Sequence, residues 1–451
     1  MRRQEVTDGK TLFGIKLSTF QIIIAGFLGL IALGTLLLML PFASAAEGSA
    51  SLSDALFTSC SAVCVTGLVV RDTATYWTLF GQIVILVLIQ IGGLGIVTVA
   101  AFTAMISGRK IGLLERSILQ DSLSAHQLGG VVKMTGFIFK IAFSAEIIGA
   151  LLVLPSFLKA FGKEGIFVSV FHSVSAFCNA GFDILGSHTG EFSSLTAFAS
   201  DLPVVIVTCL LITAGGIGFL TWEDMASNKL HFKRYRMQSK TILAAAGILV
   251  LISMVFFFFT DFSGLALRER ICLSLFQAVT PRTAGFNTAD LPKMTGPGLL
   301  ITGMLMLIGG APGSTAGGMK TTTAAVIFAN MSAVIRRKKS ARMFGRRVED
   351  SAVKNAATLL LLYLLLVSAG AVIISIAEGL PVGQCLFETA SAIGTVGLTL
   401  GITPGLCGLS RAVLEILMFF GRVGGLTLMY AAISSKETEI AQYPVEKITV
   451  G

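Results

Sequence analysis

The sequence predicts an all-α integral membrane protein made of four tandem repeats, each with a span, a shorter half-helix and a second span. Composition places the chain in lipid, because 54% of the residues are hydrophobic, 13% are charged and the mean hydropathy is +0.84. Uncharged runs such as Thr19–Phe42 and Leu79–Ile106 are long enough to cross a bilayer, which takes about 20 helical residues. A short pattern that ends in glycine recurs four times along the chain.

Eight hydrophobic segments are predicted to cross the membrane. The first follows four basic residues, but it is 24 residues long, whereas the hydrophobic region of a signal peptide has about 7–15, so we interpret it as a span. Four shorter apolar stretches of about 10–12 residues suit re-entrant half-helices better than full crossings. The predicted spans are residues 19–42, 77–107, 131–155, 196–222, 240–260, 297–332, 355–377 and 407–434. The predicted half-helices are residues 53–63, 167–178, 270–280 and 382–393.

The basic residues predict the orientation of the chain. Both terminal segments and the loops at 107–133, 223–240 and 333–354 together hold 23 Lys and Arg residues, whereas the intervening loops hold six. By the positive-inside rule the first set faces the cytoplasm, so the half-helices descend from the outer side. The formal charge of +9 therefore reflects topology, and no nucleic-acid partner is expected.

The half-helices share a pattern in which Phe is followed by Gly, and this is the strongest signal in the chain. Gly follows Phe by ten residues in the first, second and fourth repeats and by nine in the third. The third half-helix therefore matches the others at its loop but not along its helix. The four pairs are Phe57 with Gly67, Phe171 with Gly181, Phe276 with Gly285, and Phe387 with Gly397.

The glycine loops have the chemistry of an ion filter. A dehydrated monovalent cation needs oxygen ligands in place of water, and backbone carbonyls supply them where glycine lets the chain turn. The half-helices end just before the loops and bring partial negative charge to the same place. We therefore predict a pseudo-fourfold arrangement of the repeats around one central pore. The candidate filter residues are Val65, Thr66, Gly67, Asn179, Ala180, Gly181, Thr283, Ala284, Gly285, Thr395, Val396 and Gly397.

Other glycines recur in the second spans of three repeats. For these we prefer the simpler interpretation that small residues let helices approach closely in the membrane. They are Gly92, Gly93 and Gly95, Gly215, Gly216 and Gly218, and Gly424 and Gly425.

The filter residues carry a family resemblance. Thr395-Val396-Gly397 resembles the start of the potassium-channel filter, and the four-repeat plan resembles the Trk/Ktr/HKT potassium transporter superfamily. The segments Arg282–Thr288 and Gly309–Gly318 are most similar to the KtrB-type membrane subunit, and the resemblance covers nearly the whole chain. It implies potassium uptake rather than catalysis. Because the first loop carries Gly67 and not serine, it also implies preference for K⁺ over Na⁺, with Na⁺ left open as an activator.

The sixth span is interrupted by a glycine-rich stretch, and no comparable break is expected in the other repeats. Backbone exposed at membrane depth is tolerated only where it lines water or is buried in protein. A kinked helix is the alternative, and the resemblance implies instead a flexible intramembrane loop that obstructs the pore below the filter. The candidate gate residues are Gly309, Gly310, Ala311, Pro312, Gly313, Ser314, Thr315, Ala316, Gly317, Gly318 and Arg422.

Arg422 lies in the middle of the last span. A charge there costs about 2.5–3.5 kcal/mol on insertion scales, so the side chain is expected to face the pore cavity or a partner. The resemblance implies that this arginine faces the pore and limits cation flow or holds the loop. Lys320 either shares this role or extends to the membrane surface. Lys140 and Glu146 are expected to be structural or interfacial.

The predicted organisation is a cytoplasmic segment at 1–18, repeats at 19–107, 108–222, 223–332 and 333–434, and a cytoplasmic tail at 435–451. The protein is expected to be a multi-pass protein of the cell membrane. The resemblance implies a homodimer and a cytosolic ring of nucleotide-binding RCK-type subunits. The basic loop at 336–347 would dock this ring or contact anionic membrane lipid.

Two other classes of function are less favoured. A membrane-embedded enzyme needs convergent His, Asp, Glu or Cys side chains within the spans, and a carrier for a larger solute needs a roomy polar site. The seven cysteines form no CxxC pair and the four histidines are dispersed, so we expect K⁺ at the filter carbonyls as the one bound metal, and no organic cofactor. The sequence leaves open whether transport is channel-like or coupled to Na⁺.

Overall fold

The computed structural model describes residues 11–12, 15–16, 18–45, 48–109, 111–123, 130–229 and 231–432, together with residues 444, 446 and 448. Most residues of the predicted cytoplasmic segments 1–18 and 435–451 therefore lie outside the described residues. Helices dominate the described chain, as predicted. Two short hairpins accompany them, β1 (Thr11–Leu12) with β2 (Ile15–Lys16) and β3 (Arg342–Met343) with β4 (Arg346–Arg347).

Four helices are long and apolar enough to cross a membrane, and they coincide with the predicted first spans. They are α1 (Thr19–Leu38), α7 (Val131–Phe161), α12 (Met237–Phe259) and α16 (Asp350–Glu378). Each is followed by a half-helix close to its predicted bounds. The half-helices are α2 (Leu52–Val63), α8 (Gly165–Phe177), α13 (Leu267–Val279) and α17 (Val382–Gly394).

The second spans are all broken, so the expectation that the other three would be uninterrupted is wrong, whereas among the described residues the long non-helical stretch between two halves of a span occurs in the third repeat alone, as predicted. Helices α4 and α5 meet at 96°, α10 and α11 meet at 95°, and residues 308–320 separate α14 from α15. Helices α18 and α19 meet at Gly424, where φ is +93°. The bounds are α4 (Leu79–Leu94), α5 (Ile96–Ile106), α10 (Leu202–Gly216), α11 (Phe219–Asn228), α14 (Gly296–Leu307), α15 (Thr321–Ile335), α18 (Gly408–Val423) and α19 (Gly425–Ala432).

The glycines of the second spans have two separate roles. Gly95, Gly218 and Gly424 have φ of +87°, +84° and +93°, which a helix does not allow, so each lies where one helix ends and the next begins. The packing interpretation was wrong for these three. It was right for Gly92 and Gly215, because a Cβ atom there would lie 2.1 Å and 1.9 Å from the carbonyl oxygens at the ends of α2 and α8.

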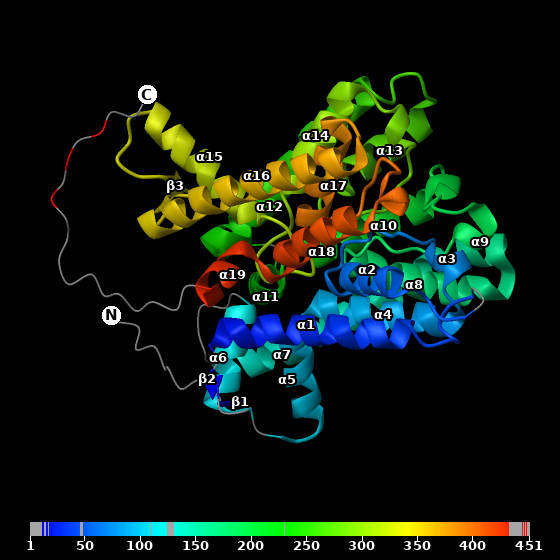
Figure 1. The fold of residues 1–451 in the computed structure, drawn as a ribbon. Helices are drawn as coiled ribbons and strands as arrows, with labels where there is room; N and C mark the ends of the chain where they lie inside the picture. The colour runs from blue at the N-terminus through cyan, green and yellow to red at the C-terminus, as the bar shows by residue number, and fades with distance from the viewer. Residues whose placement is uncertain are drawn as a thin grey trace.

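Short elements complete the described chain. Figure 1 shows α3 and α9 toward one end of the molecule and α6, α11 and α19 toward the other. The remaining helices are α3 (Thr73–Tyr76), α6 (Leu113–Ser122) and α9 (Gly186–Thr189), and the 3₁₀ turns are Gly162–Glu164, Thr196–Phe198, Phe232–Arg234, Leu291–Lys293 and Thr403–Gly405.

The half-helices pack in a closed cycle. Each contacts the first span of its own repeat, and each also contacts the second span of the repeat before it: α8 packs on α4, α13 on α10, α17 on α14, and α2 on α18. The pattern residues Phe57, Phe171, Phe276 and Phe387 are buried in this core. Large apolar side chains such as Leu36, Ile147, Leu251 and Ile376 are exposed on the long helices, as a surface in contact with lipid requires.

Candidate functional site

The four glycine loops follow the half-helices and touch one another in a ring. A Cβ atom on the glycine of each loop would collide with a carbonyl oxygen of the next loop, and the order of contacts runs through the four repeats and returns to the first. The collisions would be at 2.4 Å for Gly67 with Ala180, 2.7 Å for Gly181 with Ala284, 2.2 Å for Gly285 with Val396 and 2.2 Å for Gly397 with Thr66. The structure therefore brings the predicted filter residues of all four repeats together.

The loops share one backbone conformation. Each has a positive φ at its glycine and also at the residue two positions earlier, namely Val65, Asn179, Thr283 and Thr395, with φ of +50°, +56°, +70° and +49°. A side chain in this region costs about 1–2 kcal/mol, so the surrounding structure must hold it there. All eight candidates that are not glycine are 0% exposed.

The backbone carbonyl oxygens of the loops have no hydrogen-bond donor among the described residues. Within the described part of the chain, none of the twelve candidate filter residues accepts a hydrogen bond at its backbone carbonyl. Buried carbonyls are almost always paired, so a ring of buried, unpaired carbonyls is unusual. These oxygens are available as ligands.

In each repeat, the residue four positions after the recurring Phe of the half-helix is Ser or Thr. Its hydroxyl forms a hydrogen bond with the backbone of the glycine loop. The Ser61 and Ser391 hydroxyls each accept a hydrogen bond of 3.1 Å from the N–H of their loop glycine. Ser175 and Thr280 instead donate to the carbonyl that follows the glycine, at 2.7 Å and 2.6 Å. The Phe-to-hydroxyl spacing was visible in the sequence, but we did not identify it as a signal.

This hydroxyl corrects the predicted register of the third half-helix. Thr280 follows Phe276 by the same four residues as in the other repeats, so the helix does match them along its length. The missing residue lies between Thr280 and Thr283, where the chain turns into the loop. An alignment of the repeats at their glycines places the missing residue within the third half-helix, whereas the structure places it after that helix.

Glu388 is a second residue that the sequence reasoning missed. It directly follows the pattern Phe of the fourth repeat and is 0% exposed. Its carboxylate accepts hydrogen bonds from the Thr399 hydroxyl at 2.5 Å, the Leu400 N–H at 2.9 Å and the Thr403 hydroxyl at 2.8 Å. The carboxylate therefore holds the chain that leaves the fourth loop.

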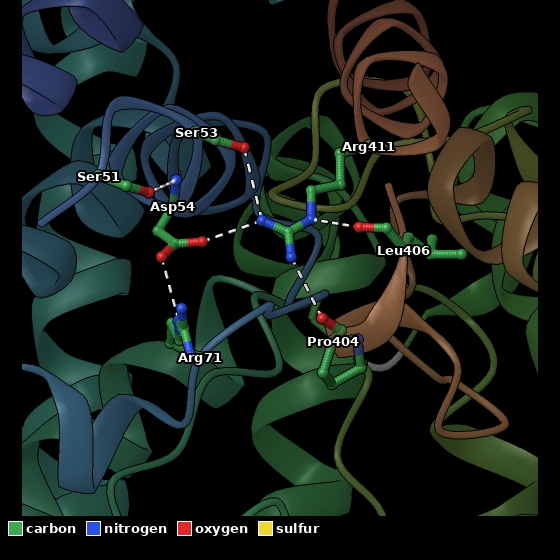
Figure 2. A network of polar contacts seen from close by, with 7 residues as sticks. All are labelled: Ser51, Ser53, Asp54, Arg71, Pro404, Leu406 and Arg411. Carbon is green, nitrogen blue, oxygen red and sulfur yellow. Dashed lines mark hydrogen bonds and ion pairs between the residues drawn. The ribbon is translucent and has the colours of Figure 1, made fainter. Parts of the chain in front are cut away.

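An ion-pair network joins the fourth repeat to the first at the N-terminal end of α2 (Figure 2). Asp54 in the first turn of α2 pairs with Arg411 of α18 at 2.9 Å and with Arg71 at 3.0 Å. Arg411 also donates to the carbonyls of Leu406 and Pro404, which follow the fourth loop. The first and fourth repeats are not consecutive in the chain, so no short loop connects them. The ion-pair network therefore holds together the one contact between neighbouring repeats that the chain does not link directly, which we call the seam.

The predicted gate segment crosses between the broken spans. Its backbone pairs with the second repeat, where Ala311 and Thr315 donate to the carbonyls of Gly216 and Gly215, at 2.8 Å and 3.2 Å. At its other end Gly318 donates to the Gly421 carbonyl at 3.1 Å. The segment thus satisfies backbone groups that the helix breaks leave free, as irregular chain at membrane depth must. The kinked-helix alternative is wrong, because residues 308–320 are not helical.

The gate segment lies against the loops of the second and fourth repeats. The Thr315 hydroxyl donates to the Phe177 carbonyl at 2.9 Å and accepts from Asn179 Nδ2 at 2.8 Å. A Cβ atom on Gly317 would lie 2.2 Å from the Thr395 hydroxyl oxygen. The predicted gate and the predicted filter are therefore in direct contact.

Arg422 holds the gate segment to the first repeat. Its guanidinium donates to the carbonyl of Thr315 in the segment and to the carbonyls of Gly92 and Gly93 at the end of α4. Lys320 is half-buried and its Nζ donates to the Ala316 carbonyl at 2.8 Å, so it turns back to the segment and does not extend to the membrane surface. No ion pair is formed by either cation within the described residues.

The other singled-out residues lie elsewhere. Glu146 is 5% exposed and accepts from Gln90 Nε2 at 2.9 Å, which joins α7 to α4, whereas Lys140 is exposed on α7. Among the described residues, no group of three or more His, Cys, Asp or Glu side chains is placed to hold a metal ion.

Comparisons with known proteins agree on one family. The family model described as "TrkH: Cation transport protein" matches residues 8–440. The potassium/sodium uptake protein NtpJ of Enterococcus hirae is 39% identical over 97% of this chain and 98% of its own. Ktr system potassium uptake protein B of Bacillus subtilis is 37% identical over 98% of this chain and 99% of its own.

A solved structure shares the fold. The potassium transporter TrkH of Vibrio parahaemolyticus superposes with a TM-score of 0.74 at 19% identity, covering 92% of this chain and 85% of its own. The family model and the full-length relatives, together with this fold, show that the chain belongs to the TrkH family of cation transport proteins.

Proposed function

We propose that this chain is the pore-forming subunit of a potassium uptake system in the cell membrane. The observation that carries the proposal is the ring of four glycine loops whose buried carbonyls accept no hydrogen bond from the described residues. Relatives named as potassium uptake proteins match nearly the whole chain, which supports K⁺ as the transported ion.

The four repeats, with the bounds predicted from the sequence, surround one pore. In this arrangement the carbonyls from Val65 to Gly67, and from the matching residues of the other loops, replace the water around a K⁺ ion. The C-terminal ends of α2, α8, α13 and α17 add partial negative charge beside the loops. Cations are attracted there and anions are excluded.

The segment from Gly309 to Gly318 is the gate. Its contacts with Asn179 and Thr395 support a position directly beneath the filter, and Arg422 anchors it to the end of α4. The charge of Arg422 adds an electrostatic barrier to K⁺ while the segment is in place. Opening requires the segment to leave its carbonyl partners on α10 and α18.

The subunit works as a homodimer with both termini in the cytoplasm, and a cytosolic ring of nucleotide-binding subunits controls its gate. The names of the relatives as parts of a Ktr system support a partner subunit. The exposed basic residues between α15 and α16 offer a docking surface for the ring or for anionic lipid. Na⁺ acts as an activator or coupled ion if flux in proteoliposomes rises when Na⁺ is added.

Flux measurements test the gate. Deletion of Gly313–Gly317 removes the part of the segment that touches the filter loops, so we expect faster K⁺ flux into proteoliposomes without added substrate or ATP. An unchanged or slower flux in folded protein would show that the segment does not obstruct the pore. A flux that depends on an organic solute would favour a carrier instead.

Replacement of Gly67 by Ser tests the filter. The new side chain would meet the Ala180 carbonyl, so the first loop must shift and discrimination against Na⁺ is expected to weaken. The ratio of K⁺ to Na⁺ flux measures this. If the ratio stays at the wild-type value in folded protein, the first loop does not take part in selection.

A further inference from the structure

A cavity of about 260 Å³ lies beside the gate segment, where the second spans break. Its walls include Gly93–Gly95 and Thr98 of the first repeat, Lys320 of the third, and Arg422–Thr427 of the fourth. None of the candidate filter residues lines it. Gly313, Ser314, Ala316, Gly318 and Arg422 do line it, so the cavity lies at the proposed gate and not at the filter loops.

The cavity carries more positive than negative charge. Arg422 and Lys320 both line it, and each donates hydrogen bonds to backbone carbonyls and forms no ion pair among the described residues. Asp121 of α6 is the carboxylate that lines the same cavity. Two cations against one carboxylate leave a net positive charge, and charges held away from water are costly unless they are compensated.

Two helices begin at the cavity wall. Helix α5 starts at Ile96, directly after Gly95, and no side chain in the described part of the chain caps it. Helix α19 starts at Gly425, within the stretch from Arg422 to Thr427. The first N–H groups of a helix have no partner inside it and carry partial positive charge, which favours an anion.

Thr98 provides an independent indication of a ligand. It is the third residue of α5, it is 0% exposed and it lines the cavity. Its hydroxyl has no hydrogen-bond partner among the described residues, although it lies beside the start of the helix, 3.6 Å from where a Cβ atom on Gly95 would be. Buried hydroxyls are seldom left unpaired.

We propose that this cavity binds a small oxyanion of the phosphate class. The first-turn N–H groups of α5 and the Thr98 hydroxyl donate hydrogen bonds to the anion, and Lys320 and Arg422 neutralise its charge. Because the two cations also bond the gate segment, the anion ties α5 and α19 to that segment in its present position. The site adjoins the proposed gate, so this inference rests on the proposed function, but its occupancy is measured without any transport.

The test is phosphate binding to the purified full-length chain in a neutral detergent. Inorganic phosphate is titrated at constant ionic strength, and binding is followed by broadening of its ³¹P resonance. Saturable binding is expected for the wild type, and Thr98→Val should weaken it about tenfold, because one hydrogen bond to a charged ligand is lost. Thr103→Val is the matched control, since Thr103 is exposed on the same helix and its hydroxyl bonds the Ala100 carbonyl at 2.9 Å. It should bind like the wild type.

Further arms keep the result decisive. Thr98→Ser retains the hydroxyl and should restore binding, and Lys320→Met should weaken binding by removing one cation, which tests the site even if Thr98→Val does not fold. Absence of saturable binding to the wild type, or equal binding by the Thr98→Val and Thr103→Val variants, would overturn the proposal. So would phosphatidylglycerol in nanodiscs saturating the site while free phosphate does not, because the ligand would then be a lipid headgroup.

Discussion

Replacing Thr315 with Val tests whether the contact between segment and filter keeps the pore closed. The Thr315 side chain is 0% exposed, and its hydroxyl bonds both the Phe177 carbonyl and Asn179 Nδ2. Val has nearly the same shape but no hydroxyl. The substitution therefore leaves a buried acceptor and a buried donor without their partner, while the bond from Arg422 to the Thr315 carbonyl is retained.

The size of the effect follows from these two bonds. A buried polar group that loses its partner costs about 1–3 kcal/mol, so with the lower value for each the two groups together destabilise the present position of the segment by about 2 kcal/mol. A shift of that size changes an equilibrium about 30-fold. If open pores are rare in the wild type, the open fraction and the K⁺ flux should rise by up to about this factor.

The assay is K⁺ flux into proteoliposomes at equal amounts of folded protein. Ser314→Ala is the matched control, because the Ser314 hydroxyl donates to the Ala311 carbonyl at 2.6 Å, within the same segment. Flux should rise for Thr315→Val and stay near the wild-type value for Ser314→Ala. Equal flux in all three proteins would refute the reasoning that this contact holds the gate shut.

Two further substitutions test the packing around the filter. Gly215→Ala would place a Cβ atom 1.9 Å from the Phe177 carbonyl oxygen, so we expect a loss of stability of a few kcal/mol and a lower melting temperature in detergent, whereas Gly303→Ala, with open space around it, should be neutral. An unchanged melting temperature for Gly215→Ala would contradict the close approach of α10 to α8. Arg411→Met leaves Asp54 with Arg71 as its ion-pair partner and should cost about 2 kcal/mol, and adding Asp54→Asn should recover part of this in a double-mutant cycle. Additive effects of the two substitutions would show that the pair does not hold the seam.

The long apolar helices and the half-helices could be predicted closely from the sequence. Their signal is local, because a run of about 20 apolar residues and a shorter run with a following glycine each have one simple interpretation in lipid. The glycine loops were predictable for the same reason. The sequence could not predict that the loop carbonyls lack hydrogen-bond donors, because this depends on which groups of the neighbouring loops lie beside them.

The breaks in the second spans could not be placed in the same way. Gly92 and Gly95 lie three residues apart, yet one allows α4 to touch α2 and the other turns the chain by a right angle. In sequence both are small residues in an apolar run. Close packing and a helix break require the same residue, so only the φ angles and the neighbouring helix separate the two roles.

By itself the sequence determined that the chain lies in lipid, where its long helices run, and which four glycines mark the loops, because these properties follow from the composition and spacing of neighbouring residues. Only the tertiary structure decided that Arg422 bonds carbonyls 107 and 330 residues away and that Thr98 and Lys320 line one cavity. The reason is physical. Every residue has a backbone carbonyl, so the sequence does not indicate which carbonyls a distant guanidinium will contact. The packing of the helices decides this.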